Sequence, residues 1–291
     1  MLPPDHPQRF VLAEEFHARP PQPLSAPARA FYLALLIGPD EREREWRHLC
    51  ALCDRHGVAA PTQAATQFSA EMGTMRVKWE RHGEFSGYTF FAAGLSPRPF
   101  SEPVAALLPP GWAQRLPGAT IASAQAEVMQ LAPEQTIDNL SDHFGANTVV
   151  GADVADGAAR VYTDLRIHGD GFSRFLVCNR RSSARQTGRT VQRLFEIEAY
   201  RMLALLALPI ARRQWPRLLA IEQSLAALTD RIAADGGDDE ALLHMLTKLA
   251  AEVESGLAAS QFRFEACGAY HQLVITRIGE LREERVPGMQ T

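Results

Sequence analysis

Lysine and cysteine are scarce in this sequence. Lys78 and Lys248 are the only lysines among 30 basic residues, so chemistry that needs a lysine nucleophile has two candidates. Four cysteines in 291 residues are too few for a disulfide framework, and the N-terminus has no charged and apolar leader. We therefore expect a protein of the reducing cytoplasm.

Long apolar runs are absent too. The longest, Met202 to Ala211, has ten residues and contains Pro209, whereas about 20 apolar residues are needed to span a bilayer. The formal net charge of −4 lacks the basic excess with which nucleic-acid binders contact phosphates. As given, the chain is predicted to be soluble and to bind no nucleic acid.

The common catalytic motifs are also missing. The sequence has no Gly-x-Gly-x-x-Gly after a strand, no phosphate loop ending in Gly-Lys-Ser or Gly-Lys-Thr, no His-Glu-x-x-His and no Gly-x-Ser-x-Gly. We therefore predict no cofactor. Whether the protein is an enzyme stays open at this point.

The patterns that are present divide the chain into a strand-rich part and a helical part. Gly171 to Asn179 is a short apolar run typical of a strand, and from Ser183 the apolar period becomes helical until Pro209. Ser183 and Gln186 have the spacing of a capping box. We expect an α+β fold, with a mostly antiparallel sheet and covering helices followed by a helical hairpin or bundle.

The domain organisation follows the same division. Residues 1–27 contain seven prolines and are expected to form an extended arm. Residues 28–181 are assigned to the sheet domain and residues 182–286 to the helical region. We expect residues 287–291 to be a truncated end, because the chain stops just after a charged helical segment.

Several elements can be placed within these regions. Residues 74–92 predict a β-hairpin with its turn between His82 and Gly87. Apolar stripes at heptad-like spacing predict an antiparallel helical hairpin around Gly236 and Gly237. The other expected elements are strands at 28–37, 120–131, 148–153 and 159–168, and helices at 41–56, 133–144, 239–257 and 262–285.

Acidic and imidazole side chains concentrate in three places of the strand-rich part. They are His17 in the arm, His82 and Glu84 near the hairpin turn, and Asp164 and His168 at the end of a predicted strand. If the arm crosses the sheet, these groups could converge as a catalytic or metal-dependent site. Otherwise His17 pins the arm, and His82 and Glu84 are solvated at an edge.

A zinc site is an alternative for the predicted helix 41–56. Cys50, Cys53 and His56 supply thiolate and imidazole ligands, and Cys-x-x-Cys is a known ligand spacing. No second such pair follows in the sequence, and both cysteines share a helical face with Trp46 and Leu49. We therefore predict two small core residues and no metal.

Arg185, Arg189 and Arg193 stack on one face of the predicted helix that starts near Ser183, because they are spaced by four. Like charges at this spacing repel each other and need compensation. Carboxylates of the same chain, such as Glu196, could provide it, and we favour this alternative. An anionic ligand, a phosphate, carboxylate or nucleotide, is the other.

Four segments carry a resemblance to a known family: EEFHARPP, KWERHGEFSGYTFF, TDLRIHGDGFSRFLV and EIEAYRMLALLALPIAR. Together they resemble the bacterial family of domain of unknown function 3422, described as predicted membrane-anchored proteins. The resemblance implies no activity. It implies a further helix and a hydrophobic hairpin beyond Thr291, which anchor full-length members to the cytoplasmic face of the inner membrane. The layout is also similar to that of the magnesium transporter family CorA, although no selectivity motif is present.

These observations lead to one functional expectation and two alternatives. We expect an interaction or sensing module that forms a homo-oligomer through its helical region. We also expect it to bind an unknown protein partner. It is expected to reach the membrane only through a C-terminal segment that is missing here. The alternatives are an enzyme or metal-dependent site built from the histidines and carboxylates, and an anion or nucleotide site at the arginine helix.

Overall fold

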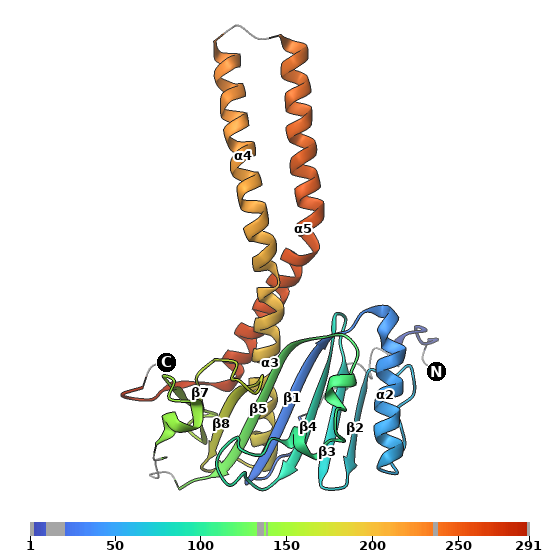
Figure 1. Ribbon diagram of the computed structural model, residues 1–291, viewed down its shortest axis with the longest axis vertical. Helices are drawn as coiled ribbons and strands as arrows, with labels where there is room; N and C mark the ends of the chain where they lie inside the picture. The colour runs from blue at the N-terminus through green and yellow to red at the C-terminus, as the bar shows by residue number, and fades with distance from the viewer. Residues whose placement is uncertain (1–2, 10–20, 133–136, 138, 235–237, 290–291) are drawn as a thin grey trace. The chain divides into compact units, whose positions relative to one another are not determined.

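The computed structural model describes residues 3–9, 21–132, 137, 139–234 and 238–289. The chain forms two compact units (Figure 1). The sheet unit comprises the residues up to Ala199 and those from Thr276 onward, and the hairpin unit comprises Tyr200–Ile275. The expected α+β class is therefore confirmed, and in sequence the hairpin unit is inserted into the sheet unit.

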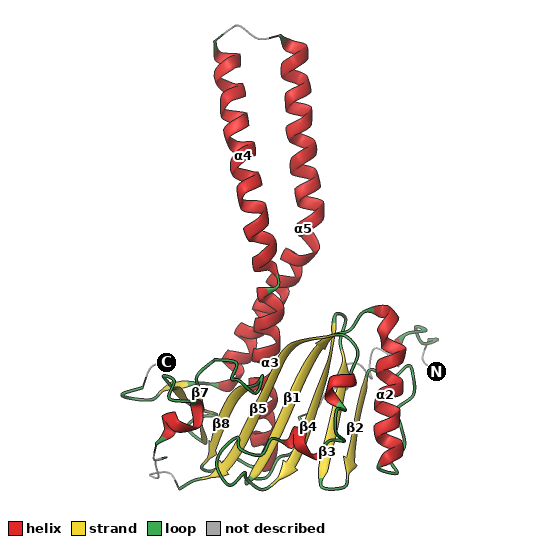
Figure 2. Cartoon of the chain, viewed as in Figure 1, coloured by secondary structure: helices red, strands yellow, loops and turns green. Residues whose placement is uncertain are grey.

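One mixed sheet organises the sheet unit (Figure 2). In the described residues it has nine strands in the order β2-β3-β4-β1-β5-β8-β7-β6-β9. Only β5 and β8 pair in parallel, so the sheet is mostly antiparallel as predicted. The strands are β1 (Ala28–Leu36), β2 (Gln67–Met72), β3 (Met75–Arg81), β4 (Phe85–Ala93), β5 (Ala119–Gln130), β6 (Val150–Val154), β7 (Ala159–Thr163), β8 (Ser173–Asn179) and β9 (Glu284–Arg285).

The sheet differs from the expectation at three places. The strands β2 and β9 were not predicted, because β2 has few branched apolar residues and β9 is only two residues long. The strand expected at 159–168 ends at Thr163. Leu165 has a φ of 56°, which lies in the left-handed region and is incompatible with a continuing strand.

One face of the sheet carries the main hydrophobic core. The helix α2 (Arg42–Arg55) packs there with the short 3₁₀ helices η2 (Val104–Leu107) and η3 (Ala113–Arg115). Two further 3₁₀ helices, η1 (Pro39–Glu41) and η4 (Leu140–Phe144), lie in the loops. Leu49 and Cys53 of α2 are fully buried against strand residues such as Phe31 and Trp79. The predicted apolar stripe of α2 is thus its core-facing side.

The opposite face of the sheet is covered by α3 (Ala184–Leu205). Tyr32 follows Phe31 in β1 and therefore points to this other face, where its ring stacks on Phe195 at 5.2 Å between centroids. The predicted capping box starts the helix, since Ser183 N donates to Gln186 Oε1 at 2.9 Å and Gln186 N donates to Ser183 Oγ at 3.4 Å.

The hairpin unit contains α4 (Ala207–Ala233) and most of α5 (Asp239–Leu281). The two helices expected at 239–257 and 262–285 are one continuous helix of 43 residues. Pro209 was expected to end a helix but lies in the first turn of α4, where its missing N–H is tolerated. None of the helices that the structure describes combines the length and apolar character needed to cross a bilayer.

Candidate functional site

On each helix of the hairpin unit, the least exposed residues recur every seven positions along a single line, which we call the contact line. On α4 this line contains Gln214, Ile221 and Leu228, seven residues apart, of which only Leu228 is buried. On α5 it contains Leu242, Leu249 and Gly256, again seven apart, with Leu242 buried. A heptad line of contact is the pattern of a coiled coil. A single such line leaves most of each helix surface uncovered.

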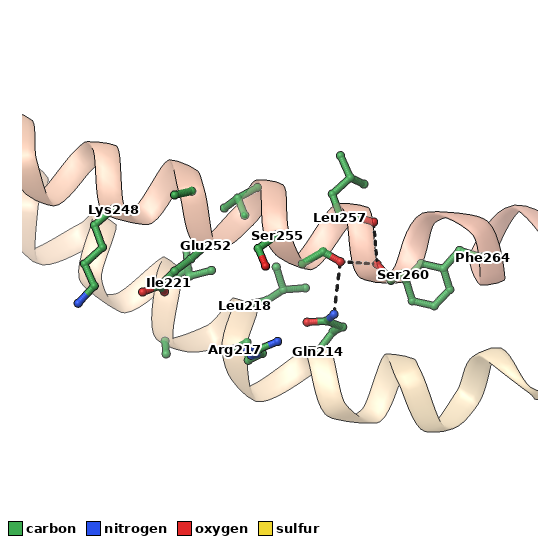
Figure 3. A pocket seen from close by; sticks show the side chains of 14 residues that line it. Gln214, Arg217, Leu218, Ile221, Lys248, Glu252, Ser255, Leu257, Ser260 and Phe264 are labelled. Carbon is green, nitrogen blue, oxygen red and sulfur yellow. Dashed lines mark hydrogen bonds between the residues drawn. The ribbon is translucent and has the colours of Figure 1, made fainter.

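A hydrogen bond joins the two helices where small residues lie on α5. Gln214 Nε2 donates to the carbonyl oxygen of Gly256 at 3.3 Å, and Ser260 Oγ donates to the same oxygen at 2.7 Å (Figure 3). A groove of about 770 Å³ runs along this contact and is lined by Leu218 and Ile221 of α4 and by Phe264 of α5, among others. The interior of the hairpin is therefore incompletely filled.

A row of large apolar side chains flanks the contact line on one side. Arg231 and Met245 each follow a contact position by three residues, and they meet with Nη1 3.6 Å from Sδ. Residues three positions after a contact residue therefore lie on one flank of the contact line. In an antiparallel pair of helices, residues four positions after a contact residue lie together on the opposite flank. We call this row the hairpin apolar face. It comprises Leu218, Leu225, Ile232, Leu246 and Val253, which follow contact positions by four, together with Leu257 and Phe264 further along the same side of α5. These side chains are 40–55% exposed.

The two ends of the hairpin carry opposite charges. The basal end, where α4 begins, has four arginines and one glutamate: Arg212, Arg213, Arg217, Arg263 and Glu265. The distal end, where α4 finishes and α5 starts, has four carboxylates and one arginine in its described residues: Asp230, Arg231, Asp238, Asp239 and Glu240. At a rise of about 1.5 Å per residue the ends are about 40 Å apart. The hairpin is therefore an electric dipole along its length.

Comparison with known proteins places the whole chain in one family. The family model described as "Protein of unknown function (DUF3422)" matches residues 4–291. The chain belongs to this family. No curated protein and no solved structure matches it.

The acidic and imidazole residues of the DUF3422 chain lie at separate places. His82 and Glu84 lie in the β3–β4 turn, where the His82 ring stacks on Phe85 at 4.1 Å between centroids. Asp164 and His168 follow β7, and β1, β5 and β8 lie between β4 and β7. At about 4.8 Å per strand the two pairs are about 19 Å apart. The predicted residue His17 lies outside the described residues.

Asp164 and His168 do come together. His168 Nε2 lies 3.0 Å from Asp164 Oδ2, and the Asp164 side chain is fully buried. The same carboxylate accepts hydrogen bonds from Asn147 Nδ2 at 2.8 Å and from the backbone N–H of Arg166 at 3.2 Å. A carboxylate can be buried in a folded protein when hydrogen-bond donors of this kind satisfy its oxygen atoms. Through Asn147, the Asp164–His168 pair therefore holds the turn that follows η4.

The cysteines of α2 are in an environment that keeps them protonated. Burial raises the pKa of the Cys53 thiol to about 11, and burial also raises the pKa of Cys50. A zinc ligand must be a thiolate, which this environment disfavours. Within the described ranges, no group of three or more His, Cys, Asp and Glu side chains, Cys50, Cys53 and His56 included, is placed to hold a metal ion.

The three arginines of α3 differ in their surroundings. Arg193 Nε lies 3.0 Å from Glu280 Oε2, and Arg277 contacts both Glu280 and Glu196. Carboxylates of the same chain thus compensate Arg193. Arg185 and Arg189 are exposed and form no ion pair with the residues that the structure describes.

One buried carboxylate was missed by sequence reasoning. Glu45 is fully buried and its Oε1 accepts hydrogen bonds from Trp79 Nε1 at 2.9 Å and from Tyr88 Oη at 3.1 Å. Its neighbours Glu43 and Arg47 are exposed and pair with each other at 2.5 Å. The available signal was the spacing of four between Glu45 and the core residue Leu49, which places Glu45 on the buried stripe.

Proposed function

We propose that this DUF3422 protein is a self-associating module whose functional surface is the hairpin apolar face, and that its partner there is a second copy of the same chain. The observation that carries the proposal is the single contact line between α4 and α5. Of the 27 residues of α4, all described, only Ala207 and Leu228 are buried. An amphipathic helix pair obtains most of its stability from tertiary packing, so this pair needs a further surface.

The energetics support a reversible assembly. Burying a fully exposed Leu, Ile, Val or Phe side chain contributes about 1.5–3 kcal/mol, so a half-exposed one gains about 1 kcal/mol. The hairpin apolar face has seven such side chains, which amounts to about 14 kcal/mol when two copies meet. The loss of translational and rotational freedom opposes this with about 4–15 kcal/mol. We therefore expect a concentration-dependent equilibrium.

Two copies of the same surface pair most simply around a two-fold axis. In such a dimer, if residue i of one copy contacts residue j of the other, residue j of the first copy also contacts residue i of the second. Two hairpins that pair through their apolar faces form a four-helix bundle, in which the exposed stripes become core positions.

The charges of the hairpin favour an antiparallel orientation of the two copies. Parallel hairpins would bring the two arginine-rich basal ends together, and likewise the two acidic distal ends. Antiparallel hairpins bring the basal end of each copy to the distal end of the other. Exposed charges act over about 10 Å at 0.1 M salt, far less than the length of the hairpin, so only directly opposed ends contribute.

Sedimentation velocity over a wide concentration range tests the proposal. We expect the full chain to sediment as a monomer at low concentration and as a dimer at high concentration. Leu225→Glu should raise the dissociation constant at least about tenfold, because it places an unpaired charge in the apolar interface. Gln223→Glu is the matched control, since it adds the same charge on the exposed side away from the contact line.

Two outcomes would contradict the proposal. One is a chain that stays monomeric at all concentrations. The other is a dimer whose affinity is equal in the Leu225→Glu and Gln223→Glu variants. The membrane anchor beyond residue 291 and the place on the cytoplasmic face of the inner membrane, which the resemblance implies, stay predictions.

A further inference from the structure

A small cavity lies between α2 and the loop around η3, within the sheet unit. Its volume is about 230 Å³. His48 and Arg55 of α2 line one side, and Trp112 and Arg115 line the other, with three apolar residues between them. The sequence distance between the two sides explains why no motif indicated this cavity.

The cavity is cationic. Two arginines line it, and no carboxylate does. Two other arginines of α2 are neutralised by ion pairs with nearby glutamates. Arg44 pairs with Glu41 at 2.8 Å, and Arg47 pairs with Glu43. Neither Arg55 nor Arg115 has an ion-pair partner in the described part of the chain. Arg115 Nη1 donates instead to the carbonyl oxygen of Pro110 at 3.2 Å.

Trp112, which lines this side of the cavity, also has a buried indole N–H. The residue is 4% exposed, and its Nε1 is buried without an acceptor among the described residues. Its ring stacks on His48 at 4.8 Å between centroids, and His48 Nε2 donates to the Trp112 carbonyl oxygen at 2.9 Å. A buried donor without an acceptor destabilises the folded protein, so a ligand oxygen that reached it would be stabilising.

We propose that this cavity binds a small oxyanion, namely the phosphate or carboxylate group of a small metabolite. Arg55 and Arg115 clamp the anion with charge-assisted hydrogen bonds, and the Trp112 indole supplies a third donor after a small side-chain shift. Drug-sized ligands occupy cavities of about 300–1,000 Å³, so this one holds the anionic group and leaves the rest of a larger molecule outside. The site is independent of the hairpin unit.

The indole N–H signals of the full chain provide a direct test. Its four tryptophans give four such signals in a ¹H–¹⁵N correlation spectrum, and Trp112→Phe identifies the one from Trp112. Inorganic phosphate, methyl phosphate, acetate and succinate are titrated separately at constant ionic strength set with chloride. We expect a saturable shift of the Trp112 signal. Stronger binding of the two phosphates assigns a phosphate site, and stronger binding of the carboxylates assigns a carboxylate site.

Matched arginine variants separate a specific site from general anion attraction. Arg55→Gln and Arg115→Gln should each weaken the saturable binding at least about tenfold. Arg47→Gln removes an equal charge from the same helix outside the cavity and should bind like the unaltered protein. The proposal is overturned if none of the four anions gives a saturable shift, or if all three variants bind with equal affinity.

Discussion

Arg193 of α3 holds Glu280 of α5 by two contacts. Its Nε lies 3.0 Å from Glu280 Oε2 and its Nη1 donates to the Glu280 carbonyl oxygen at 2.9 Å. The two residues are separated by the whole hairpin unit in sequence. The side chain therefore ties the returning end of α5 to the helix that covers the sheet, and charge-assisted hydrogen bonds of this kind are among the stronger ones.

Replacing Arg193 tests this tie. Because both side chains are partly exposed, at 21% and 37%, Arg193→Ala should lower the free energy of unfolding by only about 1 kcal/mol. Urea unfolding measures the change. Arg185→Ala, on the same helix and without an ion pair in the described residues, should stay within about 0.5 kcal/mol of the unaltered protein. Equal effects of the two substitutions would contradict a specific role of the Arg193–Glu280 pair.

The buried carboxylate Glu45 gives a larger expected effect. Glu45→Ala leaves the Trp79 N–H, the Tyr88 hydroxyl and the nearby Arg81 guanidinium, 3.8 Å away, without this acceptor. We expect a loss of about 3–5 kcal/mol in the free energy of unfolding. Glu45→Gln keeps an acceptor oxygen and should lose clearly less. If the two variants are equally stable, the hydrogen bonds of Glu45 do not hold α2 to the sheet.

Charge reversal tests the antiparallel orientation of the proposed dimer. Arg213→Glu with Arg217→Glu reverses the basal end, and Asp230→Arg with Glu240→Arg reverses the distal end. Each pair should raise the dissociation constant about tenfold, because like charges then oppose each other. All four changes together should restore part of the affinity, since the ends again carry opposite net charges, −1 and +1.

A parallel dimer predicts a different pattern. In that arrangement each end meets its own copy, and the reversed ends carry a smaller net charge, −1 in place of +3 at the basal end and +1 in place of −3 at the distal end, so the repulsion falls. All three variants would then dimerise at least as tightly as the unaltered chain, and added salt would strengthen the unaltered dimer. In the antiparallel arrangement added salt weakens it. Circular dichroism checks that each variant keeps its helices.

His48 predicts a pH dependence of stability. Burial lowers the pKa of its imidazole, Arg115 lowers it further, and the hydrogen bond to the Trp112 carbonyl opposes these effects. The unfolded chain then binds the proton more readily than the folded one, so the stability contributed by neutral His48 is present above about pH 6.5 and is lost as the pH falls from there through the lower pKa of the folded chain. Urea unfolding between pH 5 and 8 in phosphate-free buffer should show this loss, and His48→Gln should reduce it. An unchanged profile in His48→Gln would exclude His48 as its source.

Gly188 predicts a packing requirement for the segment before β1. A Cβ atom on Gly188 would lie 1.8 Å from the carbonyl oxygen of Gln22, and Leu24 N donates to the Ala184 carbonyl oxygen at 2.9 Å nearby. Gly188→Ala must push this segment off α3, at about 1–3 kcal/mol. Hydrogen exchange should become faster at Leu24.

Gly268 of α5 supplies the control for this substitution. A Cβ atom there meets nothing within 4 Å, so Gly268→Ala should raise helix stability by up to about 1 kcal/mol. If Gly188→Ala is as stable as the unaltered chain and exchange at Leu24 is unchanged, the close approach to Gln22 does not matter for folding.

Local patterns in the sequence were sufficient for much of the fold. The capping box of Ser183 and Gln186 and the heptad stripes both depend on residues within a few positions of each other. They were predicted because propensity and periodicity act over that range. Elements without such a signal cannot be predicted in this way. The two-residue strand β9, for example, is defined only by its pairing with β6.

The candidate sites depend on contacts between distant residues, which periodicity cannot indicate. Asp164 meets Asn147 across a turn, and Arg55 meets the loop of Arg115 only because α2 packs on that face of the sheet. The hairpin apolar face was partly foreseeable, since its stripes were present in the sequence. The exposure of these stripes could not be predicted from the sequence, because it depends on how little surface α4 and α5 bury against each other.

The insertion of the hairpin unit within the sheet unit sets an order of events during synthesis. The 76 residues of Tyr200–Ile275 must be translated before the end of α5 and β9 can join the sheet. At about 5–20 residues per second this takes about 4–15 s. Under the proposed function, the assembly surface leaves the ribosome while the sheet still lacks its last strand. Neighbouring nascent chains on one messenger can then pair before either of them is complete.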